Sequence, residues 1–323
     1  MSYARSLLLA LTISAVPIFA VGQEVEEASE QPTAPLQKTE AKTEVSNVDR
    51  AFGAFQRGMY LTAFYLALPE AQAGNAAAQT LIAELYDSGL GIAQDPEEAF
   101  SWYKIAANSG NREAQFAYAV KLLEGKVTDK NVELGMDIMK SAADAGHPTA
   151  MFNYATYRIN QRPTGATYRK VLPMLEKAAE YRLADAYYAL AKIYEEGLAT
   201  GVSDPERGLV WLERAAMAGI DTAQVELALK FISGSAGVKD EARAFSLLKI
   251  AANRGNVIAQ NRIAHLLFLG LGTERSEVEA AKWHILASRA GRSDFDLDRQ
   301  METLSADVKQ QALQQANRWP SVN

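Results

Sequence analysis

The chain has 323 residues, of which 48% are hydrophobic and 22% are charged, and its formal net charge is -6 with a pI near 5.3. This balance is typical of a globular or solenoid protein with a continuous core, and the acidic charge argues against a general nucleic-acid binder, which needs a basic surface. The sequence contains no cysteine, which excludes disulfides, thiolate zinc sites and thiol catalysis.

The N-terminal residues have the pattern of a secretory signal peptide. Arg5 precedes an apolar stretch from Leu7 to Ala20, and the small residues Ala20 and Gly22 mark a cleavage site. The apolar stretch is shorter than the roughly 20 residues that a membrane-spanning helix needs. We therefore expect residues 1–22 to be a cleaved signal peptide and the mature chain to be periplasmic, without stable membrane insertion. An uncleaved anchor is the alternative.

Two segments separate the signal peptide from the regular part of the chain. Residues 23–47 are rich in Glu, Thr, Ala, Lys and Pro and nearly lack large apolar side chains, so they cannot offset their ordering entropy. We expect a disordered acidic linker there. Residues 48–74 place Ala63, Leu66 and Ala71 with the spacing of a second repeat helix. This spacing predicts a degenerate N-terminal capping repeat.

From Asn75 onward the sequence repeats itself in steps of 36 or 37 residues. Alanine occupies the fourth and ninth positions of every repeat, and the eighth position is always large and apolar. At 100° per residue these three positions lie on one face of a helix. The six repeats are residues 75–110, 111–146, 147–182, 183–219, 220–255 and 256–291.

The second half of each repeat predicts a second amphipathic helix. It ends in a pair of small residues, such as Ala106-Ala107, with a bulky side chain four positions before the pair, such as Trp102. A glycine-bearing turn separates the two halves, so the two helices run antiparallel. Residues 292–319 place apolar side chains at helical spacing and predict C-terminal capping helices, which close the last repeat.

The repeat pattern A-x-x-x-(L/I/Y)-A, a glycine-rich turn and A-x-x-(W/L)-x-x-x-A-A-x-x-G resembles the Sel-one-like repeat family, which is related to tetratricopeptide repeats. The resemblance covers residues 75–291. It implies an all-α fold, a right-handed superhelical α/α solenoid of antiparallel helix pairs. Repeat three departs most from the pattern, since Arg182 stands where the closing glycine belongs and residues 160–165 replace the usual turn.

Residues that could support catalysis are few. The histidines His147, His265 and His284 do not form an i, i+4 metal pair, and His147 lies at a helix start, where capping explains it. No H-E-x-x-H, G-x-S-x-G or phosphate-loop motif occurs in the sequence. We therefore expect no catalytic residue, no metal site, no cofactor and no enzymatic activity.

The charge reverses locally in repeat three. Residues 147–182 contain six Lys or Arg against two Glu, and seven of the 13 tyrosines lie between positions 154 and 194. Tyrosine and arginine are enriched at interface hot spots. The alternative is that the tyrosines belong to the core and the basic residues form a solvated face. The residues that we expect to bind a partner are Tyr157, Arg158, Arg162, Tyr187 and Tyr188.

A solenoid offers an extended groove along its first helices, and binding is its natural use. The first hypothesis is a periplasmic scaffold or adaptor that binds another envelope protein or a peptide segment in this groove. A regulatory version, implied by exported relatives, is an inhibitor of a membrane sensor kinase. A polysaccharide or peptidoglycan binder is a further alternative. The resemblance also implies a cell-wall hydrolase, but that group is cysteine-rich, and this chain has no cysteine.

Overall fold

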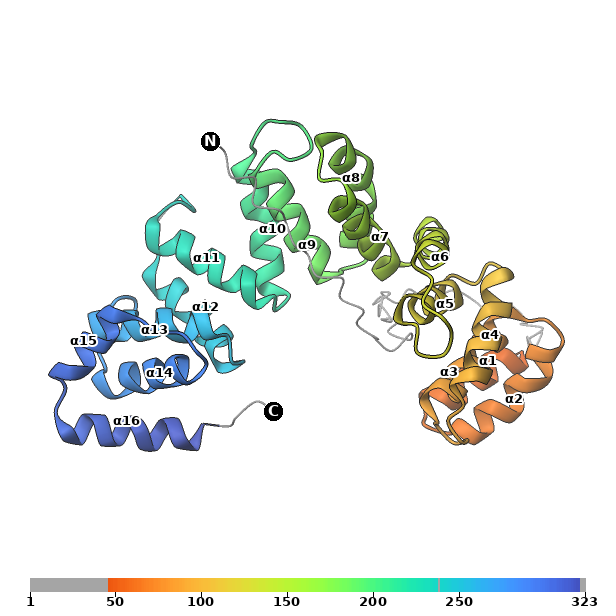
Figure 1. Cartoon of the computed structure of the whole chain (residues 1–323), viewed down its shortest axis with the longest axis horizontal. Coiled ribbons are helices and arrows are strands. Elements are labelled where there is room, and N and C mark those ends of the chain that lie inside the picture. Colours follow the sequence, from red (N-terminus) through yellow and green to blue (C-terminus); the bar gives the residue numbers. More distant parts are fainter. Residues whose placement is uncertain (1–45, 238, 320–323) are drawn as a thin grey trace, which may run out of the picture. The chain divides into compact units, whose positions relative to one another are not determined.

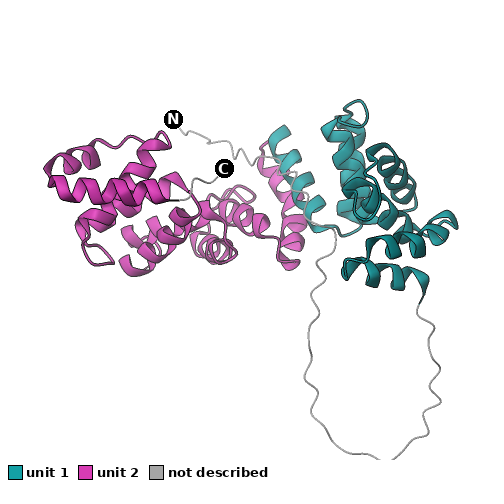
Figure 2. Cartoon of the chain, turned by 90° about the horizontal axis from the view of Figure 1, so that it is seen from below, with its two compact units in different colours: residues 1–162 teal, residues 163–323 magenta. Residues whose placement is uncertain are grey.

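The computed structural model describes residues 46–237 and 239–319. All regular elements in these residues are α-helices, sixteen in number. The predicted signal peptide and nearly all of the predicted linker lie outside the described residues. The chain divides into two compact units between Arg162 and Pro163, which is inside repeat three (Figure 2).

The first unit contains seven helices, each packed against the next along the chain (Figure 1). They are α1 (Asn47–Gln56), α2 (Tyr60–Gln72), α3 (Ala76–Ser88), α4 (Pro96–Asn108), α5 (Arg112–Glu124), α6 (Val132–Asp144) and α7 (Pro148–Gln161). Helices α3, α5 and α7 are the first helices of repeats one to three, and α4 and α6 are second helices.

The second unit contains nine helices, of which α8 to α14 pack in sequence and α16 packs on α14. They are α8 (Gly165–Glu180), α9 (Ala184–Glu195), α10 (Pro205–Met217), α11 (Asp221–Ser233), α12 (Glu241–Asn253), α13 (Val257–Leu269), α14 (Glu277–Arg289), α15 (Phe295–Thr303) and α16 (Ala306–Arg318). The second helices of repeats three to six are α8, α10, α12 and α14. The all-α fold expected from the sequence is confirmed.

The repeated alanines form the core of both units. At the fourth and ninth repeat positions every alanine is at most 1% exposed, from Ala78 to Ala264. The alanine pairs of the second helices are similarly buried, as Ala215 and Ala216 in α10 are. A methyl group lets two helix backbones approach closely, so the constant positions set the packing of each helix pair. The remaining positions are free to vary.

Side-chain caps begin most of the helices of the repeats. Asp95 and Asp204 each accept backbone hydrogen bonds at the start of a second helix, with proline in the first turn. Asn75, Asn111 and Asn256 cap first helices in the same way. His147 caps α7, because its Nδ1 accepts the backbone N–H of Ala150 at 3.2 Å. The capping role predicted for His147 is confirmed.

Glycine is required in the turn between α13 and α14. Gly272 has φ +69°, and a Cβ atom there would lie 2.0 Å from the carbonyl oxygen of Glu241 at the start of α12. A side chain would collide with the backbone in a conformation that L-residues rarely adopt. The turn therefore rests directly on the preceding second helix. At the end of α8, Arg182 replaces the closing glycine and still adopts φ 61°.

A buried glutamine joins successive repeats at the fifth repeat position. The Nε2 atom of Gln224 donates to the carbonyl of Ala216 at 3.0 Å, and Gln79, Gln115 and Gln260 make the equivalent bond to the preceding second helix. Each of these carbonyls also accepts the N–H of the closing glycine, as Ala216 does from Gly219, so the glutamine adds a second hydrogen bond at the helix end. In repeats three and four this position holds Met151 and Tyr187.

Helix α15 is held to the last repeat through two aspartates. Asp294 caps α15 and accepts hydrogen bonds from Asn261 and His265, both at 2.9 Å. Burial would raise the pKa of Asp294, but these bonds and the Leu297 N–H hold it well below its usual value. His284 Nε2 lies 2.7 Å from Asp298. Two of the three histidines thus fasten the C-terminal cap.

Candidate partner-binding site

Three of the five predicted binding residues lie at α7 in the first unit. Tyr157 is half-buried and Arg158 is exposed. The Arg158 guanidinium donates to the hydroxyl of Tyr154 at 2.9 Å. Arg162 is the exposed C-cap residue of α7, and its N–H donates to the carbonyl of Arg158. The end of α7 therefore presents two arginines and a tyrosine.

The other two predicted residues, Tyr187 and Tyr188, lie on α9 in the second unit. Tyr187 is half-buried and its ring stacks on Trp211 of α10, with 5.8 Å between the ring centroids. Tyr188 donates its hydroxyl to Glu226 of α11 at 2.6 Å. Burial and this hydrogen bond raise the pKa of Tyr188 well above its usual value. Both tyrosines thus serve packing between helices as well as exposing part of their rings.

A charged network that was not predicted from the sequence lies beside Tyr188. Lys192 Nζ lies 3.1 Å from Glu195 and 3.5 Å from Glu226, and Lys230 lies 2.5 Å from Glu195. Burial opposes ionisation of Glu195, yet the two lysines hold its pKa below the usual value. We call Tyr188, Lys192, Glu195, Glu226 and Lys230 the first-helix network. It joins α9 to α11.

The same cross-repeat ion pair occurs in the first unit. Lys121 of α5 pairs with Asp87 of α3 at 2.5 Å, and these two residues occupy the repeat positions of Lys230 and Glu195. In both cases the thirteenth position of one repeat is acidic and the eleventh position of a paired repeat is basic, and this pattern is visible in the sequence. Aligning the exposed positions, as well as the alanines, would have found it.

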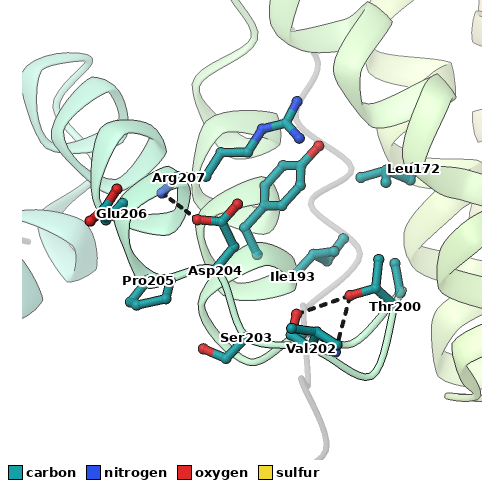
Figure 3. Close-up of a pocket in the computed structure, with 12 residues that line it drawn as sticks. Leu172, Ile193, Thr200, Val202, Ser203, Asp204, Pro205, Glu206 and Arg207 are labelled. Carbon is teal, nitrogen blue, oxygen red and sulfur yellow. Dashed lines mark hydrogen bonds between the residues drawn. The ribbon is translucent and has the colours of Figure 1, made fainter.

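A pocket of about 450 Å³ opens at the turn between α9 and α10 (Figure 3). Leu172, Ile193 and Val202 line its apolar part, and Arg207 lies at its edge. The Arg207 guanidinium lies 4.2 Å from the ring centroid of Tyr194. Burial and the hydrogen bond to Glu176 raise the pKa of Tyr194 to about 12. Tyr194 is therefore a neutral platform for the guanidinium at physiological pH.

In residues 46–237 and 239–319 no cluster of three or more His, Asp or Glu side chains is arranged to hold a metal ion. No helix in the same ranges is both long enough and apolar enough to cross a bilayer.

Two solved structures resemble the chain along most of its length. A Sel1 repeat protein from Oxalobacter formigenes is 28% identical, with a TM-score of 0.65, and the match covers 78% of this chain and 99% of that one. A protective antigen of uropathogenic Escherichia coli with an SLR fold is 21% identical, with a TM-score of 0.54, covering 80% of this chain and 64% of that one. The second likeness concerns the fold alone.

Two curated relatives come from yeasts. Chitin synthase regulatory factor 3 of Schizosaccharomyces pombe is 27% identical over 237 residues, which is 71% of this chain and 25% of the relative. Chitin synthase regulator SKT5 of Saccharomyces cerevisiae is 29% identical over 265 residues, which is 75% of this chain and 36% of the relative. The chain thus spans about a quarter to a third of the length of these relatives.

The family model of the Sel1 repeat matches residues 76–111, 112–147, 184–220, 222–256 and 257–291. These matches coincide with five of the six repeats and together cover more than half of the chain. The segment between the second and third matches is repeat three, the repeat with the most divergent sequence. From the repeat matches and the helical fold, we conclude that the chain belongs to the Sel1 repeat family.

Proposed function

We propose that this chain is a non-enzymatic interaction scaffold of the cell envelope that holds a polypeptide partner on its first helices. The observation that carries the proposal is the contrast between constant and variable positions. Alanines at the fourth and ninth positions are buried in every repeat, whereas the exposed positions of the first helices differ from repeat to repeat. Constant packing with variable exposed residues is the arrangement by which repeat proteins bind partners.

The first-helix network supports this use of α9 and α11. Its lysines and glutamates are already paired within the chain, so their side chains are held in place before a partner arrives. Preorganised side chains lose less entropy on binding. Tyr188 adds a partly exposed aromatic ring whose hydroxyl is fixed by Glu226. Such a surface favours a folded or extended polypeptide with complementary charges.

The names of the curated relatives support a role exerted through another protein. Both are named as regulators of chitin synthase, so their names describe the control of an enzyme. By analogy, the partner of this chain is an envelope protein whose activity or placement it controls. Export to the periplasm stays part of the proposal, and recovery of the chain from a periplasmic fraction, with an N-terminus near residue 23, tests it.

Site-specific photocrosslinking in living cells tests the scaffold. A photoreactive phenylalanine analogue is placed at Tyr157, at Lys192 and, as a control, at Ile105, which is exposed on second helix α4. The proposal predicts a defined crosslinked partner from the first two positions and none from Ile105. Crosslinking at all three positions alike, or at none, would contradict a partner held on the first helices.

A charge-reversal variant tests the predicted residues at α7. Changing Arg158→Glu and Arg162→Glu replaces two exposed side chains and should release the crosslinked partner. Lys126→Glu, in an exposed turn position that is 75% accessible, is the matched control and should retain it. If both variants retain the partner, the scaffold proposal stands and the α7 arginines are excluded as its binding residues. Retention on peptidoglycan, with no protein captured, would favour the glycan alternative.

A further inference from the structure

The second helices of repeats three to five share a basic surface that the other second helices lack. Two positions, eight residues and one residue before the first alanine of the pair, lie two helical turns apart on one face of each second helix. They hold Lys170 and Lys177 in α8, Arg207 and Arg214 in α10, and Arg243 and Ile250 in α12. The same positions hold Glu98 and Ile105 in α4, Leu134 and Ser141 in α6, and Glu279 and Leu286 in α14.

Five of the six residues on α8, α10 and α12 are basic, and all five are exposed in the second unit. We call Lys170, Lys177, Arg207, Arg214 and Arg243 the basic ridge. Glutamates stand among them, with Glu176 on α8 and Glu206 and Glu213 on α10, so the positive charge is confined to the side-chain heads at these repeated positions. Positive groups that recur at the spacing of one repeat favour a partner that places single carboxylates opposite them.

Two arginines of the ridge are held in the same geometry one repeat apart. The Arg207 guanidinium lies over the ring of Tyr194, and that of Arg243 over the ring of Phe231, each 4.2 Å from the ring centroid. Stacking on a ring orients a guanidinium and leaves its N–H donors at the edge. The two rings occupy the same position of the first helices α9 and α11.

The donors of both guanidinium groups are open to a ligand. Arg207 lies 3.8 Å from Glu176 and Arg243 lies 3.8 Å from Glu213, which is beyond hydrogen-bond distance. The two arginine side chains are 55% and 60% exposed. A carboxylate could therefore receive two parallel N–H bonds from either arginine without breaking a hydrogen bond within the described residues.

An apolar pocket adjoins each of these arginines. The pocket beside Arg207, of about 450 Å³, has an apolar lining of Leu172, Ile193 and Val202 and a polar lining that includes Glu206 and the capping residue Asp204. The pocket beside Arg243, of about 420 Å³, lies between α10 and α12. Its apolar lining consists of Ala216, Met217, Leu227, Ala242 and Leu247. Val202 is 72% exposed and Met217 is 79% exposed, so each pocket has an uncovered aliphatic wall.

We propose that the basic ridge and its two pockets bind an acidic polypeptide segment in which carboxylates alternate with aliphatic side chains. The carboxylates bind Arg207 and Arg243, and the aliphatic side chains enter the adjoining pockets. This inference rests on the proposed scaffold function and adds a second surface, on the second helices. A nucleic acid or an anionic bilayer fits less well, because Glu176 and Glu213 beside the arginines repel a continuous polyanion.

Fluorescence anisotropy with a synthetic probe tests the inference. The probe is a short labelled peptide of alternating glutamate and leucine, titrated with the full mature chain. Binding should weaken as salt rises, since exposed charges are screened. The double variant Arg207→Glu/Arg243→Glu should bind at least about tenfold more weakly, a loss of about 1.4 kcal/mol. The control Lys126→Glu/Lys239→Glu makes the same charge change at exposed lysines and should bind like the wild type.

A second pair of variants separates charge from folding. Arg207→Gln/Arg243→Gln keeps polar side chains and should still lose binding, with the helical circular dichroism and melting temperature of the wild type. Equal binding by wild type and the double Glu variant would overturn the inference, as would tighter binding of single-stranded DNA or anionic vesicles than of the peptide. If the peptide does not bind while crosslinks at Tyr157 and Lys192 persist, the basic ridge is excluded as a peptide-binding surface and the scaffold proposal stands.

Discussion

Helices α4 and α10 follow the same structural plan and differ in what they expose. Each begins with an aspartate cap followed by proline, and each buries its alanine pair. At the exposed position eight residues before the first alanine, α4 has Glu98 and α10 has Arg207. The shared residues set how a second helix packs, and the differing residues set the charge of its surface.

Packing and surface charge are therefore encoded at separate positions of the same repeat. The alanines and caps recur because every helix pair needs the same close approach. The exposed positions have no such constraint, so α10 can carry Arg207 and α4 can carry Glu98 at the same position without a change in the fold. Substitutions at the two kinds of position should therefore differ in their effect on the free energy of unfolding.

The largest effect is expected where α10 departs from α4 inside the core. Gly208 in α10 stands at the position of Ala99 in α4. A Cβ atom at Gly208 would lie 2.9 Å from the backbone nitrogen of Glu195. Gly208→Ala should therefore force α9 and α10 apart and lower the free energy of unfolding by about 3 kcal/mol. Urea denaturation measures this change.

The reverse exchange in α4 is the control for Gly208→Ala. Ala99→Gly adds no atom and should cost about 2 kcal/mol, from the penalty of glycine inside a helix and the loss of one buried methyl group. If Gly208→Ala proves as stable as the wild type, the close contact of α10 with Glu195 does not constrain the packing.

The next effect concerns the cap of α7, which is His147 where other first helices have asparagine. Burial lowers the pKa of His147 from 6.5 to about 4. Because the folded pKa lies below the unfolded one, the stabilisation is complete above about pH 6.5 and is lost as the pH falls toward 4. The wild type should lose about 2 kcal/mol of unfolding free energy over this range.

His147→Asn should keep the cap and remove this pH dependence. Asparagine caps α3, α5 and α13 in the same way and does not titrate. Urea denaturation of both proteins between pH 7 and pH 4 measures the difference. An identical loss of stability in wild type and variant would show that other groups cause the acid sensitivity.

Much of the fold was predictable, because the features that define it recur at fixed spacing. The alanine positions, the Asp-Pro caps and the role of His147 follow from the sequence alone. The glutamine bonds, such as Gln224 to Ala216, did not, because a side chain and a carbonyl eight residues apart meet only when two helices pack. Arg182 likewise adopts a left-handed conformation that its residue type disfavours.

The candidate site was less predictable than the fold, for a physical reason. Tyr188 was chosen by residue type, but its partner Glu226 is 38 residues away and is set by the next repeat. Lys192 and Arg207 were not predicted as functional residues, because a charged residue on a helix is usually solvated. Their neighbours Glu195 and Tyr194 give them a role, and aligning exposed positions between repeats is the way to find such pairs.

A smaller effect is expected from the buried glutamine at the fifth repeat position. Gln224→Met copies the residue found at Met151 and keeps the side-chain volume. It removes one hydrogen bond and also the buried Oε1 atom that has no partner. The two effects oppose each other, so the unfolding free energy should change by less than about 1 kcal/mol. Gln224→Ala, the comparison variant, should cost about 2 kcal/mol by leaving a cavity. An equal loss of unfolding free energy in both variants would show that the lost hydrogen bond and the removed Oε1 atom do not offset each other.

The smallest effect on stability is expected from the charges that distinguish α10 from α4. Arg207→Glu/Arg243→Glu changes two exposed side chains, each with a carboxylate 3.8 Å away. Exposed pairs of this kind contribute little, so the unfolding free energy should change by less than about 1 kcal/mol. Thermal denaturation followed by circular dichroism measures it.

The most direct test of the separation between packing and binding is to measure stability and peptide affinity on the same samples of this double variant. We predict a free energy of unfolding within about 1 kcal/mol of the wild type, together with at least a tenfold loss of affinity for the acidic peptide. An unchanged affinity, or a loss of stability large enough to account for the lost binding, would contradict the account.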